Sequence, residues 1–175
     1  IRHSQTSYIS PQLKSFYPTS NFMVNRQSES IPHKFACAFI GNLDPYRMRA
    51  ISALRKFGQV DVYGKPFGKF IPDKKFVARN YKFVLAFEND FFPGYVTEKL
   101  FDAYACNSVP LYWGCLGNDK SINRNAFLNA SDFQNLEEFS YHAGNLTDLE
   151  WEVIYQQPLL NELPDFDKVQ KFLLG

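Results

Sequence analysis

The pattern of apolar and polar positions predicts strands that alternate with helices along most of the chain. Residues 81–87 form a nearly unbroken apolar and aromatic run, YKFVLAF, which is typical of a strand buried on both faces of a parallel sheet. Apolar runs at 34–40 and 60–63 predict two strands before it, and 108–113 predicts the strand after it. A further short strand is expected at 126–128.

Helix signals lie between these strands. Pro45 suits the first turn of a helix that runs from about Tyr46 to Phe57. The segment 95–99, YVTEK, is expected to open the helix that follows the longest strand. Single helical turns are expected within 73–79 and near Lys120.

The last third of the chain predicts three helices. Residues 136–143 and 149–155 have helical patterns, and Asp148 is a candidate N-cap for the second of them. Residues 165–174 have apolar side chains at helical spacing and predict a final amphipathic helix. Together with the strands, these helices predict an α/β fold, which is a parallel, doubly wound, Rossmann-like sheet with helices on both faces.

Residues 34–175 are expected to form this domain, because a chain of 175 residues is long enough for one domain with a sizeable core. Residues 1–33 are polar and irregular, and they contain three prolines. We interpret them as a linker or an arm that joins this domain to another one.

The composition argues against several classes of function. A formal net charge of +1 implies no broad basic surface, which argues against nucleic acid as the main partner. No apolar run reaches the roughly 18 residues of a membrane-spanning helix. The three cysteines, Cys37, Cys106 and Cys115, lack metal-ligand spacing and are interpreted as buried reduced thiols. Aromatic residues make up 17% of the chain, but composition does not separate a phenylalanine-rich core from rings that stack on sugars.

A polar cluster follows the longest strand, at the turn into the next helix. Glu88, Asn89 and Asp90 end the apolar run, and Lys99 falls in the first turn of the expected helix. In an open α/β sheet, ligands bind beyond the carboxyl ends of the strands. The N–H groups and the positive dipole end of a helix attract an anion there. This segment therefore suits a diphosphate.

The same segment, residues 81–114, resembles the signature of the α-1,3-fucosyltransferases of glycosyltransferase family 10. The shared pattern is FEN, a loop that ends in Tyr, VTEK, a helix that contains Ala, and a Pro-containing strand that ends in Gly. In this chain it consists of Phe87-Glu88-Asn89, Tyr95, Val96-Thr97-Glu98-Lys99, Ala103, and Val109-Pro110 through Gly114. The resemblance implies that residues 34–175 are the nucleotide-binding half of a GT-B glycosyltransferase.

The resemblance also implies roles for five residues of this chain. Lys99 would contact the diphosphate of the donor, and Glu98 would bind its ribose or its sugar. Asn89 and Tyr95 would line the donor pocket. Arg47, at the start of the first helix, would reach the β-phosphate, for which a guanidinium fork is well suited.

The charged residues among these five also have purely structural explanations. Lysines and arginines on helices are usually solvated, so Lys99 and Arg47 need not bind a ligand. Arg49 competes with Arg47 for the matching position, because both lie at the start of the same helix. A carboxylate such as Glu98 stabilises a helix N-terminus by up to about 1 kcal/mol.

The uncharged residues of the loop have structural explanations as well. Asn89 is a common turn former, and Tyr95 fits a hydrophobic staple before a helix. Glu88 has a different expected role from either of them. We expect its carboxylate to hold the loop in place by accepting hydrogen bonds from backbone N–H groups.

The function implied by the resemblance is transfer of L-fucose from GDP-fucose to a glycan hydroxyl, with inversion at the anomeric carbon and in α-1,3 linkage. The family takes its carboxylate general base from an N-terminal acceptor-binding domain, to which residues 1–33 would lead. We therefore nominate no catalytic residue, and we expect these 175 residues to bind the donor without turnover. Two alternatives stay open: another GT-B glycosyltransferase that uses GDP-mannose or a UDP-sugar, and a non-catalytic nucleotide-binding module.

No metal site and no cofactor are predicted. The three histidines lack ligand spacing, and Asp165-Phe166-Asp167 is better explained by capping of the final helix. A metal-independent donor site is expected, with stimulation by Mn²⁺ or Mg²⁺ left open. The expected partners are GDP-fucose and a glycan acceptor, with peripheral membrane association of the full-length protein as a further option. A bacterial protein would be cytoplasmic or peripheral to the membrane, and a eukaryotic one would lie in the Golgi lumen.

Overall fold

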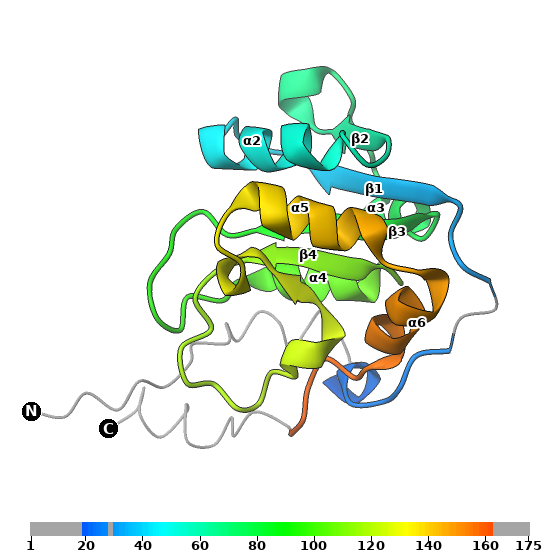
Figure 1. Cartoon of the computed structure of the whole chain (residues 1–175), viewed down its shortest axis with the longest axis vertical. Helices are drawn as coiled ribbons and strands as arrows, with labels where there is room; N and C mark the ends of the chain where they lie inside the picture. Colours follow the sequence, from blue (N-terminus) through cyan, green and yellow to red (C-terminus); the bar gives the residue numbers. More distant parts are fainter. Residues whose placement is uncertain (1–18, 28–29, 163–175) are drawn as a thin grey trace, which may run out of the picture.

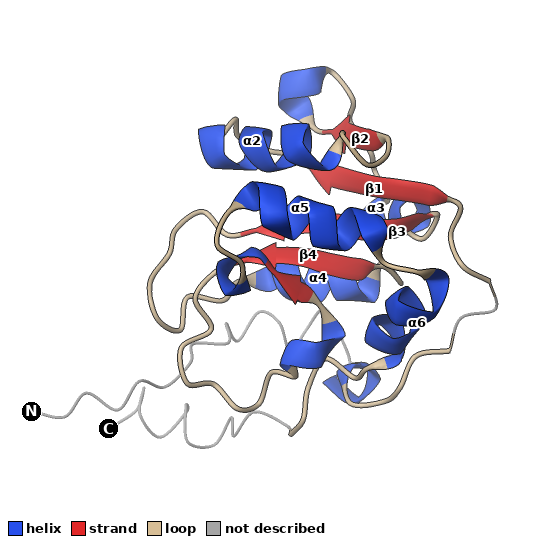
Figure 2. Cartoon of the chain, viewed as in Figure 1, coloured by secondary structure: helices blue, strands red, loops and turns tan. Residues whose placement is uncertain are grey.

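Five parallel strands form a sheet in the order β2-β1-β3-β4-β5. The computed structural model describes residues 19–27 and 30–162. The strands are β1 (Lys34–Phe39), β2 (Val60–Tyr63), β3 (Tyr81–Phe87), β4 (Val109–Trp113) and β5 (Leu128–Asn129). Helices cover both faces of the sheet (Figures 1 and 2), so the predicted Rossmann-like α/β fold is confirmed.

The helices are arranged in two layers around this sheet. The α-helices are α2 (Pro45–Leu54), α3 (Lys74–Ala78), α4 (Glu98–Ala105), α5 (Leu136–Asn145) and α6 (Asp148–Gln156). The 3₁₀ turns are η1 (Thr19–Phe22), η2 (Lys65–Phe67), η3 (Arg124–Ala126) and η4 (Ala130–Asp132). Helices α2 and α5 pack against each other on one face, whereas α3 and α4 lie on the opposite face (Figure 1).

Strand β3 contributes to the core on both sides of the sheet. Phe83, Leu85 and Phe87 face the side of α2 and α5, whereas Val84 and Ala86 face the side of α4. Alternate side chains of a strand point to opposite faces, so a strand that is covered on both sides must be apolar at successive positions. This is the physical reason for the nearly unbroken apolar run at 81–87.

The order in which the chain adds strands to the sheet reverses between β1 and β3, although all the strands are parallel. From β1 the chain runs through α2 to β2 at one edge, and it then crosses back to β3 and continues to β4. Loops that leave two neighbouring strands in opposite directions open a crevice at the carboxyl ends of those strands. The polar end of β3 and the first turn of α4 lie at this crevice.

The helix boundaries differ from the prediction by one to three residues, most clearly in α4 and α2. Helix α4 begins at Glu98 rather than at Tyr95, with Thr97 as its N-cap residue. Helix α2 ends at Leu54, three residues before the predicted Phe57, and the N–H of Phe57 bonds to the carbonyl of Leu54 in a tightened last turn. Such tightening satisfies carbonyls that have no partner at a helix end.

The prediction that Asp148 caps α6 is wrong. Thr147 is the N-cap residue, and its hydroxyl accepts a bond from the N–H of Glu150. The carboxylate of Glu150 in turn accepts the N–H of Thr147 at 2.8 Å, which completes a capping box. Asp148 is already inside the first turn, where its side chain pairs with Lys82 at 2.7 Å.

The connection between β4 and α5 also differs in detail. The helical turn that was expected near Lys120 forms later, as η3, and the strand expected at 126–128 is β5 at Leu128–Asn129. The predicted helix at 165–174 lies outside the described residues. Within the part of the chain that the structure describes, no helix is long and apolar enough to cross a membrane.

The described part of the predicted linker packs against this domain. Phe22 is buried under α4. The guanidinium of Arg26 lies between the rings of Tyr104 and Tyr155, at 3.8 and 4.1 Å from their centroids. It donates to the carbonyls of Tyr104, Ser108 and Tyr155. Burial lowers the pKa of Arg26 to about 10, and these contacts fasten the segment to α4 and α6.

Candidate functional site

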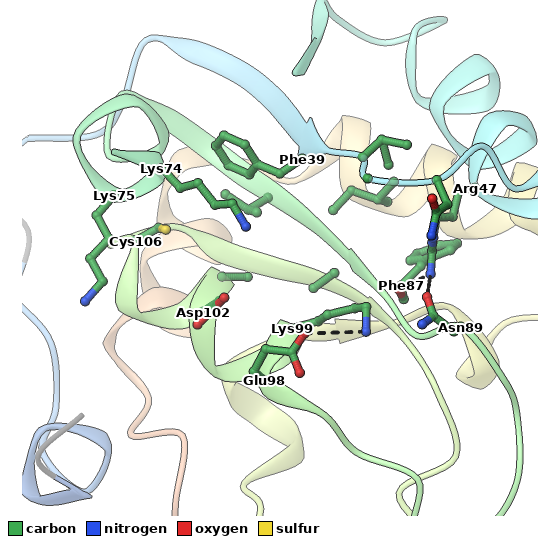
Figure 3. A pocket seen from close by; sticks show the side chains of 17 residues that line it. Phe39, Arg47, Lys74, Lys75, Phe87, Asn89, Glu98, Lys99, Asp102 and Cys106 are labelled. Carbon is green, nitrogen blue, oxygen red and sulfur yellow. Dashed lines mark hydrogen bonds and ion pairs between the residues drawn. The ribbon is translucent and has the colours of Figure 1, made fainter. Parts of the chain in front are cut away.

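A cleft of about 360 Å³ opens at the carboxyl ends of β1 and β3 (Figure 3). Its walls come from the loop after β1, from α3 and α4, and from the face of β3 between them. Small-molecule sites have volumes of roughly 300–1,000 Å³, so the cleft can hold a ligand of that class. It lies where the strand order reverses, which is the usual ligand position in this fold.

Four of the five predicted site residues line this cleft: Arg47, Asn89, Glu98 and Lys99. They reach it from separate parts of the chain. Arg47 lies in the first turn of α2, Asn89 follows the end of β3, and the other two lie in the first turn of α4. The parallel sheet brings these elements together, because the carboxyl ends of its strands meet at one edge.

Arg47 is held in place by both its backbone and its side chain. Its N–H donates to the carboxylate of Asp44, the N-cap of α2, at 2.9 Å. Its guanidinium donates to the carbonyl of Phe87 at 3.2 Å and to the side-chain oxygen of Asn89. The competing candidate, Arg49, is exposed and lies outside the lining of the cleft. Arg47 is therefore the arginine that the fold directs to this site.

Glu88 organises the start of α4. Its side chain is 0% exposed. It accepts bonds from the backbone N–H and the hydroxyl of Thr97, both at 2.7 Å, and from the ammonium of Lys99 at 3.1 Å. The hydroxyl of Tyr112 adds a longer contact of 3.4 Å. The prediction that Glu88 holds the loop by accepting backbone N–H bonds is confirmed.

Lys99 is positioned by Glu88 more than by Glu98. Its ammonium lies 3.1 Å from the carboxylate of Glu88 and 3.8 Å from that of Glu98, whose side chain is 61% exposed. A cation in the first turn of a helix is disfavoured by the helix dipole, and the buried carboxylate offsets this. In Figure 3 the ammonium points toward the pair formed by Arg47 and Asn89, so the basic groups converge.

Tyr95 is the predicted site residue that does not line the cleft. Its ring packs on Phe92, with centroids 4.7 Å apart. In the same loop Phe91 stacks on Trp113 at 5.2 Å. Both phenylalanines are about half exposed, at 46% and 49%. A role for Tyr95 in the donor pocket stays a prediction.

The end of the cleft away from Arg47 contains residues that the sequence did not single out. Lys74 comes from α3, Asp102 comes from α4, Cys106 is the C-cap residue that follows α4, and Phe39 ends β1 (Figure 3). Burial raises the pKa of the Cys106 thiol to about 12. Asp102 follows Glu98 by four residues and so shares its face of the helix, which is a signal that the sequence contained. Lys74 lies outside the signature segment and had no such signal.

The cysteines agree largely with their prediction. Cys37 and Cys106 are buried free thiols, and burial raises the pKa of both. Cys115 is also free but only half-buried. The thiol of Cys106 is therefore neutral at neutral pH, and it adds apolar rather than ionic character to the wall of the cleft.

The charge of the cleft favours an anionic ligand. Among the described residues, its lining has more basic side chains (Arg47, Lys74, Lys75 and Lys99) than carboxylates (Glu98 and Asp102). The first turn of α4 adds N–H groups at the positive end of the helix dipole. Within the described ranges, no group of three or more His, Cys, Asp or Glu side chains could hold a metal ion. Metal independence stays a prediction.

Comparison with protein families gives a match over most of the chain. Residues 31–152 match the model of the family described as glycosyltransferase family 10 (fucosyltransferase) C-term. The matched range contains all the cleft residues discussed above, from Phe39 to Cys106. It also includes strands β1 to β5, and so the whole described sheet.

Two curated relatives are similar in sequence. The chain is 34% identical to the alpha-(1,3)-fucosyltransferase FucT of Helicobacter pylori over 129 residues, which is 71% of this chain and 27% of the relative. It is 32% identical to the putative fucosyltransferase R654 of Acanthamoeba polyphaga mimivirus over 157 residues, which is 78% of this chain and 26% of the relative. The matched region is therefore about a quarter of the length of these relatives.

Solved structures have the same fold. A crystal structure of an alpha1,3-fucosyltransferase superposes with a TM-score of 0.73 at 31% identity, and it covers 84% of this chain and 46% of its own. A crystal structure of an alpha1,3-fucosyltransferase with GDP-fucose gives 0.74 at 28% identity, with 84% and 48% coverage. The chain spans about half the length of these neighbours.

Proposed function

Because the chain belongs to glycosyltransferase family 10, the fucosyltransferases, we propose that it is the donor-binding domain of an enzyme that transfers L-fucose from GDP-fucose to a glycan hydroxyl. The observation that carries the proposal is the cleft in which Arg47 and Lys99 converge beside the N-terminus of α4. A solved neighbour was crystallised with GDP-fucose and another with GDP, ligands whose charge fits such a cleft.

The basic end of the cleft has a chemical role in this reaction. When the bond between the anomeric carbon and the β-phosphate oxygen breaks, negative charge develops on the departing GDP. Donors that are already oriented toward this oxygen stabilise the transition state without reorganisation. Arg47 is ordered by Phe87 and Asn89, and Lys99 is ordered by Glu88. Both cations are thus preorganised before the donor binds.

Inversion and α-1,3 linkage are the finer parts of the proposal. An acceptor hydroxyl would attack the anomeric carbon from the side opposite to the departing GDP, and a carboxylate base would take its proton. We assign that base to a part of the enzyme outside this chain, as in the resemblance described above. In this scheme Glu98 binds the ribose or the sugar of the donor, and it takes no part in proton transfer.

The experiment that tests the proposal is calorimetric titration with GDP-fucose, GDP, GDP-mannose and UDP, without added metal. We expect GDP and GDP-fucose to bind and UDP to bind much more weakly. Lys99→Ala should weaken GDP binding by at least about tenfold, because hydrogen bonds between charged groups are worth about 1.5–3 kcal/mol. Lys56→Ala, which removes an exposed lysine of the turn after α2, is the matched control.

A second variant separates loss of binding from loss of structure. Lys99→Gln removes the positive charge but keeps a donor for the buried carboxylate of Glu88. It should fold normally and still bind GDP poorly. Preferential binding of UDP would instead indicate another sugar-nucleotide donor. Full activity of the Lys99→Ala enzyme would contradict a role for this cleft in catalysis.

A further inference from the structure

The connection from β2 to β3 has a charge that the rest of the chain does not share. Residues 65–79 contain five cations and one carboxylate, which is a net charge of +4. The whole chain has a formal net charge of +1, so the remaining residues together carry −3. Two of the five cations line the cleft, but Lys65, Lys69 and Arg79 lie outside its lining and have no part in the proposed function.

The same connection exposes two aromatic rings. Phe70 is 83% exposed and Phe76 is 59% exposed. A single exposed apolar side chain is ordinary, but apolar side chains that gather among charges mark an interaction surface. We call the exposed side chains of this connection the basic aromatic surface, and it consists of Lys65, Lys69, Phe70, Phe76 and Arg79.

The turn after β2 holds the first of these rings in a fixed position. An antiparallel bridge joins Gly64 to Lys69, and the N–H of Gly64 donates to the carbonyl of Lys69 at 2.7 Å. Phe67, within the turn, packs against the core. The closed turn thus partly buries one phenylalanine and directs Phe70, the residue after the bridge, toward solvent.

Helix α3 presents the second ring at the same end of the sheet. Val77 and Ala78 pack on its inner side into the same core cluster as Tyr63, the last residue of β2. On its exposed side the guanidinium of Arg79 lies 4.2 Å from the centroid of the Phe76 ring. The two exposed phenylalanines are six positions apart in the sequence, so their Cα atoms are at most about 20 Å apart.

An anionic lipid bilayer complements both features of this surface. Its negative potential attracts basic side chains, and each one near the surface strengthens binding by about fivefold. Aromatic rings enter the boundary between headgroups and acyl chains, while ammonium and guanidinium groups stay at the level of the phosphates. Among the described residues, Lys65, Lys69 and Arg79 form no ion pair that competes with these phosphates. An acidic soluble protein would satisfy the cations but would leave the two rings against polar groups.

We propose that the basic aromatic surface docks this protein on an anionic lipid bilayer, with Phe70 and Phe76 inserted below the headgroups and with the three cations on the lipid phosphates. The turn follows the carboxyl end of β2, and the cleft opens at the carboxyl ends of β1 and β3. In a parallel sheet these ends share one edge, so docking holds the cleft close to the membrane. The inference does not depend on which ligand the cleft binds.

Vesicle co-sedimentation of the 175-residue protein tests this docking. Vesicles that contain about 30% phosphatidylglycerol in phosphatidylcholine should bind the protein at least about tenfold more strongly than vesicles of phosphatidylcholine alone. Raising the salt concentration from about 0.1 M to about 1 M should weaken this binding at least about fivefold, because the Debye length falls from about 10 Å to about 3 Å. This comparison uses the unmodified protein, so it does not depend on the folding of a variant.

Two pairs of substitutions test the rings. Phe70→Ser combined with Phe76→Ser should weaken binding to the anionic vesicles at least about tenfold, because apolar burial in the interface is lost. Phe91→Ser combined with Phe92→Ser is the matched control, since it removes two other exposed rings, in the loop after β3. Binding by the control should stay within about twofold of binding by the unmodified protein. Circular dichroism verifies that both variants fold.

The outcomes separate the role of the rings from the role of the charges. Equal binding to the two kinds of vesicle, or no binding to either, would overturn the proposal. Unchanged binding after loss of Phe70 and Phe76, with weaker binding by Lys65→Gln combined with Lys69→Gln, would show that charge alone is recognised, as by an acidic soluble partner. It would overturn insertion of the rings. An equal loss in the control would overturn the assignment to this surface. GDP titration measures the proposed function separately, so either proposal can fail without the other.

Discussion

The side chain of Glu88 couples the end of β3 to the start of α4 and to Lys99. It is fully buried, and the groups that it bonds are a backbone N–H, two hydroxyls and an ammonium. A buried carboxylate is retained at acceptable cost only when such partners surround it. Glu88 therefore acts on the cleft indirectly, by fixing where Lys99 and the N-terminus of α4 lie.

Replacement of Glu88 by Ala should lower the free energy of unfolding by about 3 kcal/mol, because it leaves the Thr97 N–H and the Lys99 ammonium without their buried partner. Glu98→Ala is the matched control, since Glu98 contacts the same ammonium from an exposed position. It should cost less than about 1 kcal/mol. Urea unfolding of both variants measures the difference. Equal losses would show that Glu88 does not organise this turn.

The residues of the site differ in how far the sequence could predict them. Lys99 and Glu98 were predicted because they lie within one continuous signature next to a helix start. The partner of Lys99 had no local signal, because Glu88, eleven residues earlier, makes a shorter contact with its ammonium than the sequence neighbour Glu98 does. Lys74 was missed because its approach to the cleft depends on where α3 packs.

At the level of elements, helix starts depend on which side chain reaches the first N–H groups. Both Thr147 and Asp148 are suitable cap residues by type. Thr147 takes the role because Glu150 lies three residues later and can bond back to the N–H of Thr147. In α4 the start is set from outside the helix, because the carboxylate of Glu88 accepts the N–H of Thr97.

The assignment of the α6 cap leads to a prediction. Thr147→Ala should lower the free energy of unfolding by about 1 kcal/mol, because the N–H of Glu150 loses its acceptor. Asp148→Ala should cost less than about 0.5 kcal/mol, because its pair with Lys82 is exposed. Thermal or urea unfolding of the two variants measures both values. A larger loss for Asp148→Ala would contradict the capping box.

At the level of the whole molecule, the described residues form one five-stranded sheet, and the chain spans about half the length of its solved neighbours. Its cleft opens at the carboxyl edge of that sheet, and its lining has more basic side chains than carboxylates. In the proposed function, the acceptor and the general base come from elsewhere in the enzyme. Binding and turnover can therefore be separated by experiment.

The purified 175-residue chain should bind GDP but should not transfer fucose to a glycan acceptor, because the proposed scheme assigns the general base to another part of the enzyme. The enzyme that contains this chain should transfer fucose, and EDTA should leave that rate nearly unchanged, because Arg47 and Lys99 neutralise the diphosphate. Product formation followed by mass spectrometry measures both. Transfer by the chain alone, or loss of activity in EDTA, would contradict the corresponding part of the scheme.

The fold could be predicted from the sequence because its signals are local. An apolar run that is buried on both faces, as at 81–87, has few structural solutions other than a central parallel strand. Alternation of such runs with helical patterns then favours a doubly wound sheet. The boundaries were less accurate, as the shortened α2 and the shifted β5 show, because helix and strand ends depend on contacts with distant residues.

The sequence by itself determined the family and the parallel α/β fold, and it placed the polar segment that we expect to bind a diphosphate at the end of β3. Tertiary structure alone decided that Arg47 rather than Arg49 reaches the cleft, that Glu88 holds Lys99, and that Lys74 and Asp102 share its far end. The physical reason is that hydrophobic periodicity and capping are properties of neighbouring residues, whereas a site is made by side chains from separate elements. Their convergence depends on the order and packing of the whole sheet.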